Sequence, residues 1–366
     1  MTKSIPVITT SQIFGVLERN AETGDNTFIE GPSGMGKTDI FNQFAEAQAA
    51  KRGLEFYKMS HDKIKTPWEK TYGLITALPS TWDSLDIKGG PVVDLEMEAT
   101  RFLINSVLPN EKRHGKFGFC NFDDLAQAPM SVINPLTQVF HGGIIGDSYV
   151  WPKGWQIGAT ANRREDHAST TRIGAHVYNR FRCYEGRPCA NAFSQYLLAK
   201  GSDGRVGGFI RLREEHLHNY ERGDRSFPSP RQWETVDRDL REIDDQAFLE
   251  LQIGAAVSVP VAAELMGYLA ICSQITSFAK IVKDPVKAKV PTPGEASATA
   301  ATFALIGMCA GKRLNEKNID AVTTYVKRLP EDFTMVWMLD VIENHNCLQE
   351  TVAFSRLRAD MGKFAV

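Results

Sequence analysis

Short apolar runs alternate with amphipathic stretches from about residue 12 to residue 185. This alternation is typical of a parallel sheet covered by helices. The runs predicted as strands are Asn26 to Glu30, Leu54 to Met59, Phe117 to Phe122, Trp155 to Ala161 and Phe181 to Glu185. Helices are predicted from about Lys37 to Arg52, ended by Gly53, and from about Leu95 to Leu108, with Asp94 as N-cap.

The pattern changes at two places along the chain. Residues 60–93 are too long for a simple connection and are rich in proline, glycine and tryptophan, so they are predicted to form an irregular insertion. After about residue 190 helical periodicity dominates. The sequence therefore predicts an α/β domain over residues 1–190 and an all-helical domain over residues 191–366.

Composition and charge narrow the function classes. The 366 residues hold 42 Lys and Arg against 44 Asp and Glu, a formal charge of −2, with 43% hydrophobic and 23% charged residues. These values are ordinary for a soluble globular chain with a sizeable core. The near balance of positive and negative residues excludes a protein that surrounds nucleic acid with a strongly positive surface. It equally excludes a protein with a long acidic tail.

Cysteines and apolar stretches bear on the compartment. The six cysteines do not have the spacing of a zinc knuckle or a redox pair, which favours free buried thiols in a reducing environment. The first residues lack the apolar segment of a signal peptide. The most apolar stretch, Ile253 to Ile271, carries Pro260 and Glu264 and is interpreted as a buried helix. We therefore expect no membrane association and a cytoplasmic location.

A glycine-rich loop separates the first predicted strand from the following helix. Its residues fit the pattern Gly-x4-Gly-Lys-Ser/Thr and are Gly31, Pro32, Ser33, Gly34, Met35, Gly36, Lys37 and Thr38. Glycines let backbone N–H groups curl around phosphate oxygens, and the positive end of the helix adds its field. Lys37 is expected to reach the β and γ phosphates, and the Thr38 hydroxyl to ligate Mg²⁺.

Two carboxylates follow the predicted strand at 117–122. Asp123 stands at its carboxyl end, where it can hold the water shell of Mg²⁺, and Asp124 is expected to polarise an attacking water. The residue that usually occupies the second position is Glu, which is longer by one methylene, so hydrolysis is expected to be slow. The alternative interpretation is an acidic turn after a strand.

Further polar residues suit the same chemistry. Asn162 ends the predicted strand at 155–161, where it is expected to sense a γ-phosphate; the alternative is a turn residue. Arg180 precedes the last predicted strand, and an arginine there can stabilise transition-state charge in a neighbouring subunit. A surface ion pair is the alternative for Arg180. Arg182, Arg172 or Arg164 can share or take its role.

These motifs together resemble the AAA+ ATPases, and more narrowly the MoxR group often encoded beside a von Willebrand A-domain protein. The motifs that carry the resemblance are residues 31–38, residues 123–129, the strand ending at Asn162, residues 179–181 and residues 229–233. Similar short segments also occur at residues 86–91, 155–163 and 328–333. The resemblance covers nearly the whole chain. It implies an αβα core with a parallel five-stranded sheet of order 5-1-4-3-2, a helical lid, and a ring, usually hexameric, with nucleotide sites between subunits.

The same resemblance assigns further roles. It implies that Arg231 contacts the γ-phosphate from a lid helix; the alternative is a solvated arginine at an ordinary helix start. Ser229 can cap that helix and Pro230 fits its first turn. The resemblance also implies that residues 60–93 and the hairpin-like segment 142–150 face the ring pore or a partner.

The leading hypothesis is an ATPase that binds and hydrolyses Mg·ATP in a ring and remodels a partner protein. One alternative is a phage or mobile-element nucleic-acid remodeller; the basic stretch Lys280, Lys283, Lys287 and Lys289 does not by itself indicate nucleic acid. Another alternative is a slowly hydrolysing, nucleotide-gated scaffold.

Overall fold

The chain folds into two compact units. The computed structural model describes residues 5–59, 64–96, 98–103, 106–145, 149–163, 173–274, 276–290, 295–309 and 313–361. The units are Met1–Arg187 and Pro188–Val366, and the sequence analysis places the boundary three residues later. The first unit is an α/β structure, and the described residues of the second form helices and loops.

A seven-stranded parallel sheet forms the centre of the first unit. Its strands are β1 (Val7–Thr9), β2 (Thr27–Gly31), β3 (Glu55–Lys58), β4 (Thr71–Ala77), β7 (Phe117–Phe122), β10 (Trp155–Asn162) and β11 (Arg182–Arg187). They lie in the order β1-β11-β2-β10-β7-β4-β3, and every neighbouring pair is parallel. All seven strands therefore direct their carboxyl ends to one edge of the sheet.

The five predicted strands are confirmed, but the predicted sheet is incomplete. Their order across the sheet is the predicted one, with β1 added beyond β11 and β4 inserted between β7 and β3. The expectation that residues 60–93 are irregular is therefore wrong for β4, which is almost wholly buried. Pro67 and Pro79 bracket this strand and conceal it, because they break the pattern just outside a buried run that itself contains no proline.

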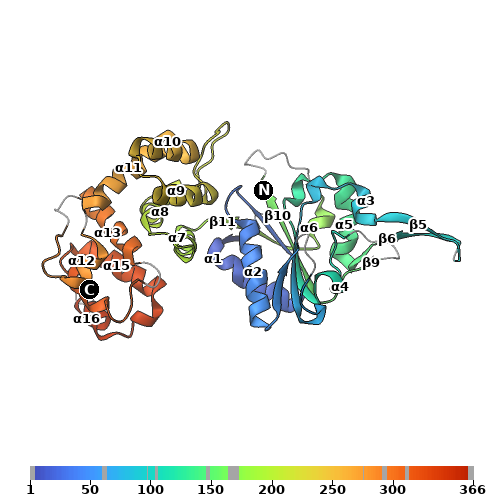
Figure 1. The fold of residues 1–366 in the computed structure, drawn as a ribbon, viewed down its shortest axis with the longest axis horizontal. Helices are drawn as coiled ribbons and strands as arrows, with labels where there is room; N and C mark the ends of the chain where they lie inside the picture. Colours follow the sequence, from blue (N-terminus) through green and yellow to red (C-terminus); the bar gives the residue numbers. More distant parts are fainter. Residues whose placement is uncertain are drawn as a thin grey trace. The chain divides into compact units, whose positions relative to one another are not determined.

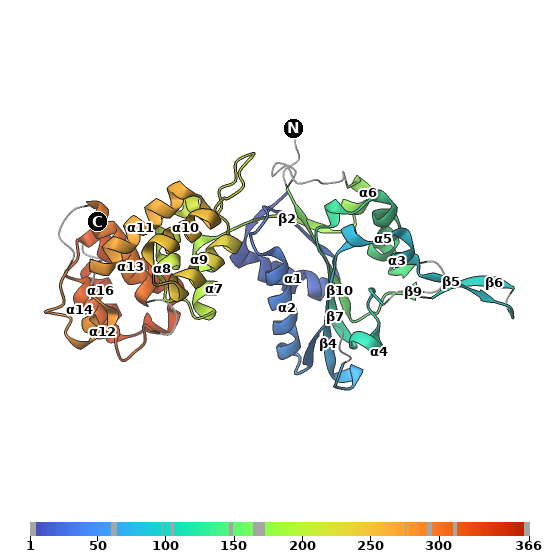
Figure 2. The same ribbon diagram turned by 45° about the horizontal axis from the view of Figure 1, so that its top comes forward.

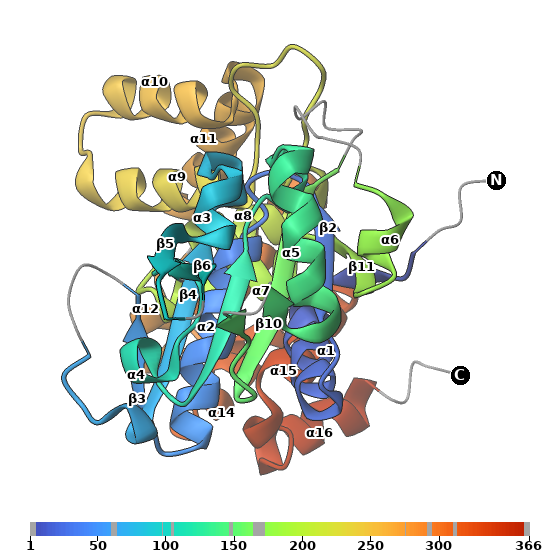
Figure 3. The ribbon, with the colours of Figure 1, turned by 90° about the vertical axis from the view of Figure 1, so that its right-hand side faces the viewer.

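Helices cover both faces of the sheet, which gives the first unit three layers in the order helix, sheet, helix (Figure 1). On one face lie α1 (Thr10–Thr23) and α2 (Lys37–Lys51), and on the other α3 (Ser84–Lys88), α5 (Met130–Gly142) and α6 (Ala175–Tyr178); α4 (Glu111–His114) precedes β7 (Figure 3). Phe41 and Phe44 of α2 meet Phe119 of β7 edge to face. On the opposite face Phe122 packs against Phe140 of α5. Successive residues of β7 thus serve two separate cores.

The first unit also contains two hairpins. The larger pairs β5 (Gly90–Asp94) with β6 (Ala99–Leu103), and it extends away from the sheet (Figure 2). The prediction of a helix over 95–108 is wrong here, because almost every residue of both strands is exposed and no face is available for a helix to bury. The smaller pairs β8 (Ile144–Ile145) with β9 (Tyr149–Val150); the residues between them lie outside the described part of the chain.

The second unit consists of helices around two apolar cores. The helices are α7 (Ala190–Ala199), α8 (Arg205–Leu212), α9 (Pro230–Glu242), α10 (Gln246–Val257), α11 (Val259–Gln274), α12 (Phe278–Lys283), α13 (Glu295–Cys309), α14 (Ile319–Val326), α15 (Glu331–Asn344) and α16 (Val352–Met361). Trp233 is fully buried in one core and Trp337 in the other. The Ser229 hydroxyl accepts from the Gln232 N–H, so the predicted cap of α9 is confirmed.

The most apolar stretch forms two helices. Ser258, with φ of +84°, separates α10 from α11, so the single helix predicted over 253–271 is wrong. Leu265 and Tyr268 of α11 are buried in the unit's own core. By length and composition alone, the stretch Val259–Lys283 passes as a candidate membrane span, and 19% of its apolar window is buried. This is weak evidence for a span, since core helices pass the same test.

Candidate functional site

The glycine-rich loop joins β2 to α2 at the carboxyl edge of the sheet. β2 ends at Gly31, one residue after the predicted end, and α2 begins at Lys37, as predicted. Gly34 has φ of +78° and Gly36 has φ of +94°, a region that residues with a Cβ rarely adopt. The two glycines therefore allow the loop to curl back over the first turn of α2.

Met35 anchors the loop to the sheet. Its side chain is buried, and a Cβ added at Gly31 would lie 2.5 Å from the Met35 sulfur and 2.9 Å from the Gly186 carbonyl oxygen. A Cβ at Gly186 would likewise meet the Met35 methyl at 2.7 Å. The bulky side chain at this loop position is thus accommodated by two glycines on neighbouring strands, β2 and β11.

Lys37 is buried, and its amine is surrounded by oxygen acceptors. The Nζ atom donates to the Gly31 carbonyl at 2.9 Å, to the Pro32 carbonyl at 3.0 Å and to Asn162 Oδ1 at 2.9 Å. Burial without such partners would be costly for an ammonium group. The three acceptors hold the positive charge at the loop, beside the end of β10.

Asp123 and Thr38 form the second part of the site. The Thr38 hydroxyl donates to Asp123 Oδ2 at 2.8 Å, and the Thr160 hydroxyl donates to Asp123 Oδ1 at 2.5 Å. A hydroxyl beside one carboxylate is the donor set that Mg²⁺ takes when phosphates and waters complete its octahedron. The residues present therefore fit a magnesium–nucleotide site.

Asp124 adopts the left-handed conformation and is held at two points. Its φ is +49°, which Asp tolerates better than most residues with a Cβ. Its N–H donates to the Thr160 hydroxyl at 3.0 Å, and Asn162 Nδ2 donates to its carboxylate at 3.0 Å. Asn162 thus links Lys37 to Asp124 through the two ends of one amide.

Thr160 is a site residue that sequence reasoning missed. Its hydroxyl is shared by both aspartates, and the side chain is fully buried. It stands two residues before Asn162 on β10, so the two side chains lie on the same face of the strand. A polar residue two positions before Asn162, in the stretch from Ile157 to Ala161 that is otherwise apolar, is the signal that identifies it.

Replacement of Thr160 by valine, which keeps the shape and removes the hydroxyl, is expected to lower the free energy of unfolding by about 1–3 kcal/mol. The Asp124 N–H then loses its acceptor and Asp123 loses a donor. Denaturant titration measures the change. Thr160→Ser is the control and should stay near the wild type; equal stability of the valine variant and the wild type would contradict this role.

The arginines proposed to act in trans differ in their surroundings. Arg182 forms an ion pair with Asp25 at 2.6 Å. Arg180 is half-buried, and its Nε has no hydrogen-bond partner among the described residues. Asn26 Nδ2 donates to the Arg180 carbonyl at 3.1 Å and fixes its backbone. Arg164 and Arg172 lie outside the described residues.

Arg231 belongs to the second unit. It is the second residue of α9, directly after Pro230, and its side chain is exposed. Its position on a capped helix start is therefore as predicted, whereas its contact with a nucleotide stays a prediction.

The cysteines are free thiols that differ in their exposure. All six are free, as predicted, although only Cys120 and Cys309 are buried and Cys347 is exposed. Burial raises the pKa of Cys183 to about 11, so this thiol is protonated at neutral pH. Among the described residues, no group of three or more His, Cys, Asp and Glu side chains is placed to hold a metal ion.

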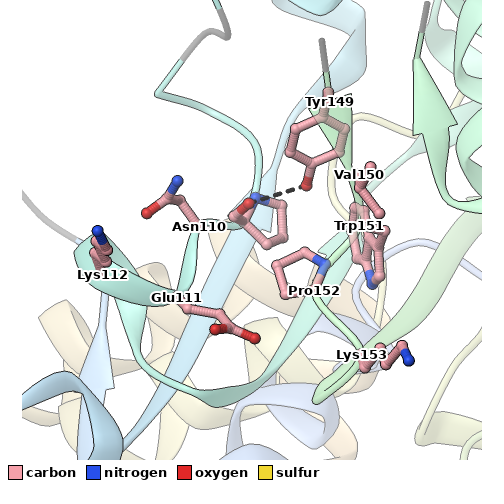
Figure 4. A pocket seen from close by; sticks show the side chains of 9 residues that line it. Asn110, Glu111, Lys112, Tyr149, Val150, Trp151, Pro152 and Lys153 are labelled. Atoms are coloured by element: carbon pink, nitrogen blue, oxygen red, sulfur yellow. Dashed lines mark hydrogen bonds between the residues drawn. The ribbon is translucent and has the colours of Figure 1, made fainter. Parts of the chain in front are cut away.

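A cavity of about 520 Å³ lies elsewhere on the first unit (Figure 4). It is lined by residues 109–112 and 149–153. These segments precede β7 and β10, so the cavity lies toward the amino ends of the strands, at the opposite edge from Lys37. The Tyr149 hydroxyl donates to the Pro109 carbonyl at 2.9 Å, so this hydroxyl already has a hydrogen-bond acceptor within the protein.

Comparisons with known proteins give only a distant likeness. No protein-family model and no curated protein matches the sequence. The chain is similar to the RuvB Holliday junction branch migration motor of Thermotoga maritima, with 13% identity over 72% of this chain and 69% of the other, and a TM-score of 0.35. It is also similar to a putative ATPase from Cytophaga hutchinsonii (15% identity, 90% and 81% coverage, TM-score 0.34). A third similar structure is NtrX from Brucella abortus in complex with ADP (14% identity, 97% and 68% coverage, TM-score 0.39). These values are too low to assign a function, which is therefore inferred from the site itself.

Proposed function

We propose that this chain is an ATP-hydrolysing P-loop enzyme of the AAA+ type, close to the MoxR group. In this proposal it assembles into a ring, hexameric by resemblance, and remodels a partner protein in the cytoplasm. The observation that carries the proposal is the convergence of Lys37, Thr38, Asp123, Asp124 and Asn162 in one hydrogen-bonded network at the carboxyl edge of the sheet. The strand order β11-β2-β10-β7 within the sheet supports it, since it agrees with that group's 5-1-4-3.

Each member of the network has a task that its position supports. The Lys37 ammonium group carries the charge that attracts the β and γ phosphates. Thr38 and Asp123 would hold Mg²⁺, which would supply neutralisation of the charge on the phosphate oxygens. The Asp124 carboxylate accepts a proton from the attacking water. The shorter side chain in place of Glu makes slow turnover part of the proposal.

Asn162 couples nucleotide occupancy to the general base. Its Oδ1 accepts from Lys37 and its Nδ2 donates to Asp124. One side chain therefore contacts both the lysine proposed to bind phosphate and the proposed general base. A γ-phosphate that draws the Lys37 amine toward itself weakens the bond from Lys37 to Asn162 and frees that amide to reorient. Because the same amide orients Asp124, the position of the base then reports the presence of the phosphate.

Arg180 is proposed to complete the site of a neighbouring subunit. Its Nε is buried and without a partner in the described part of the chain, while Arg182 is paired with Asp25. The residue as a whole is only half-buried, so a second copy of this chain can bring phosphate charge to its guanidinium group. Arg231 is proposed to contact the γ-phosphate from the helical unit.

Mixing two inactive variants tests this shared site. Arg180→Ala and Lys37→Ala are each expected to lose hydrolysis, but in a one-to-one mixture about a quarter of the interfaces combine an intact Lys37 with an intact Arg180. Steady-state phosphate release should therefore recover toward that fraction of the wild-type rate. Arg182→Ala is the control and should stay active alone. No recovery above either variant would contradict action in trans.

The β5–β6 hairpin is proposed to contact the protein partner. Val93, Leu95 and Leu103 are between 66% and 84% exposed, so their apolar side chains are accessible to a partner. The Arg101–Asp94 ion pair at 2.8 Å braces the two strands. By resemblance, the partner is a von Willebrand A-domain protein.

A further inference from the structure

Asn121 is a polar residue in the core of the first unit. It lies in β7, two residues before Asp123, and its side chain is fully buried. Neither its Nδ2 nor its Oδ1 has a hydrogen-bond partner among the described residues. Leaving both ends of a buried amide unpaired destabilises a fold, so the group calls for an explanation.

The side chain of Asn121 faces α2, on the same side of the sheet as the nucleotide site. Phe119, two residues earlier, packs against Phe41 and Phe44 of α2. Asp123, two residues later, accepts a hydrogen bond from Thr38 of α2. Since side chains alternate along a strand, Asn121 shares this face with both of them.

A polar residue lies beside this position on one of the two neighbouring strands. Thr76 of β4 is the register partner of Asn121, and its hydroxyl lies 3.5 Å from Asn42 Oδ1 on α2. On the other side the register partner is Gly158, where a Cβ would lie 2.5 Å from the Phe119 ring. The polar residues on this face are called the polar column below, and they are Thr38, Asn42, Thr76, Asn121, Asp123 and Thr160.

The polar column has the composition of a hydrated second layer behind a metal site. A buried water is stable when it finds two to four polar partners, and the amide of Asn121 offers a donor and an acceptor to one. Groups that orient metal ligands from behind contribute strongly to metal affinity. An apolar residue would pack better in a buried strand, so a position that breaks this rule is expected to serve function.

We propose that Asn121 is a positioning residue for the magnesium–nucleotide site. It holds one buried water between its amide and the Asp123 carboxylate and so fixes the orientation of Asp123 toward Thr38. This inference rests on the proposed function. It concerns the affinity for Mg²⁺ rather than the chemical step, because Asn121 touches neither nucleotide nor attacking water.

Asn121→Leu tests the proposal, since leucine has a similar size and no polar atoms. The Mg²⁺ concentration that half-saturates the tightening of ATP binding, measured by calorimetry, should rise about tenfold. ATP affinity in excess EDTA should stay within about twofold, and Tm should not fall, because leucine fills the volume of the amide in the core. Asn121→Thr, which keeps a hydroxyl on a β-branched side chain, should restore most of the Mg²⁺ dependence.

Cys120→Ala is the matched control. Cys120 is equally buried but packs in the core on the opposite face of β7, so its variant should lose stability and keep the wild-type Mg²⁺ dependence. Wild-type Mg²⁺ dependence in Asn121→Leu would overturn the inference. A parallel loss of ATP affinity with and without Mg²⁺, together with a lower Tm, would also overturn it by showing a structural role. Wild-type protein that binds ATP no better than Lys37→Ala would instead overturn the proposed function, and the inference with it.

Discussion

Replacing Lys37 by alanine is expected to lower ATP affinity and phosphate release by at least about 100-fold. The ammonium group donates to the loop carbonyls of Gly31 and Pro32 and to the amide oxygen of Asn162. Its removal takes away the attraction for the phosphates and leaves those acceptors without their donor. Binding of ATP followed by calorimetry, and phosphate release at saturating ATP, measure the two effects.

Lys51→Ala is the control for this substitution. Lys51 lies at the other end of α2, is exposed, and pairs with Glu18 at 3.2 Å. Exposed ion pairs contribute at most about 1 kcal/mol, so this variant should bind and hydrolyse ATP like the wild type. If Lys37→Ala kept wild-type ATP binding, the P-loop interpretation would be wrong.

Asp124→Asn is expected to lower kcat by about 10²- to 10⁴-fold while ATP binding stays nearly unchanged. The asparagine keeps an oxygen to accept from Asn162 Nδ2, and its N–H can still donate to Thr160, so the geometry is preserved. What disappears is the capacity to take a proton from water. Single-turnover hydrolysis of bound ATP separates this effect from product release.

Two neighbouring substitutions sharpen the test of Asp124. Asp124→Glu keeps a carboxylate and should keep measurable hydrolysis, whereas Asp123→Asn should lose the Mg²⁺ dependence of binding as well as turnover. Unchanged kcat in Asp124→Asn would show that another group activates the water, or that the chain acts as a scaffold without catalytic turnover of its own.

The site could be predicted largely because its parts are local or end a strand. The P-loop is a continuous run of eight residues with a required strand before it and a helix after it, so its geometry depends little on distant packing. Asp123, Asp124 and Asn162 each stand at the end of an apolar strand. In a parallel sheet all such ends meet at one edge, and adjacent strands then bring the polar residues together.

Two strands that were not predicted, β4 and β6, have no distinctive pattern in their own residues that identifies them as strands. Prolines flank β4 in the sequence, and this pattern favours an irregular insertion. The burial of β4 between β7 and β3 nevertheless makes it a central strand. Residues 99–103 fall within the predicted helix, yet they form one arm of an exposed hairpin. This strand is held by pairing with β5, a partner that the periodicity of one segment cannot reveal.

The amino-acid sequence by itself determined the phosphate loop, the polar residues that follow β7 and end β10, and the change from an α/β unit to a helical one, because these follow from short local patterns. Only the tertiary structure decided how these residues are joined. It showed that Thr160 serves both aspartates, that Asn162 spans Lys37 and Asp124, and that Asn121 is buried behind Asp123. Such relations depend on strand register and on burial, and both arise from contacts between residues far apart in the chain.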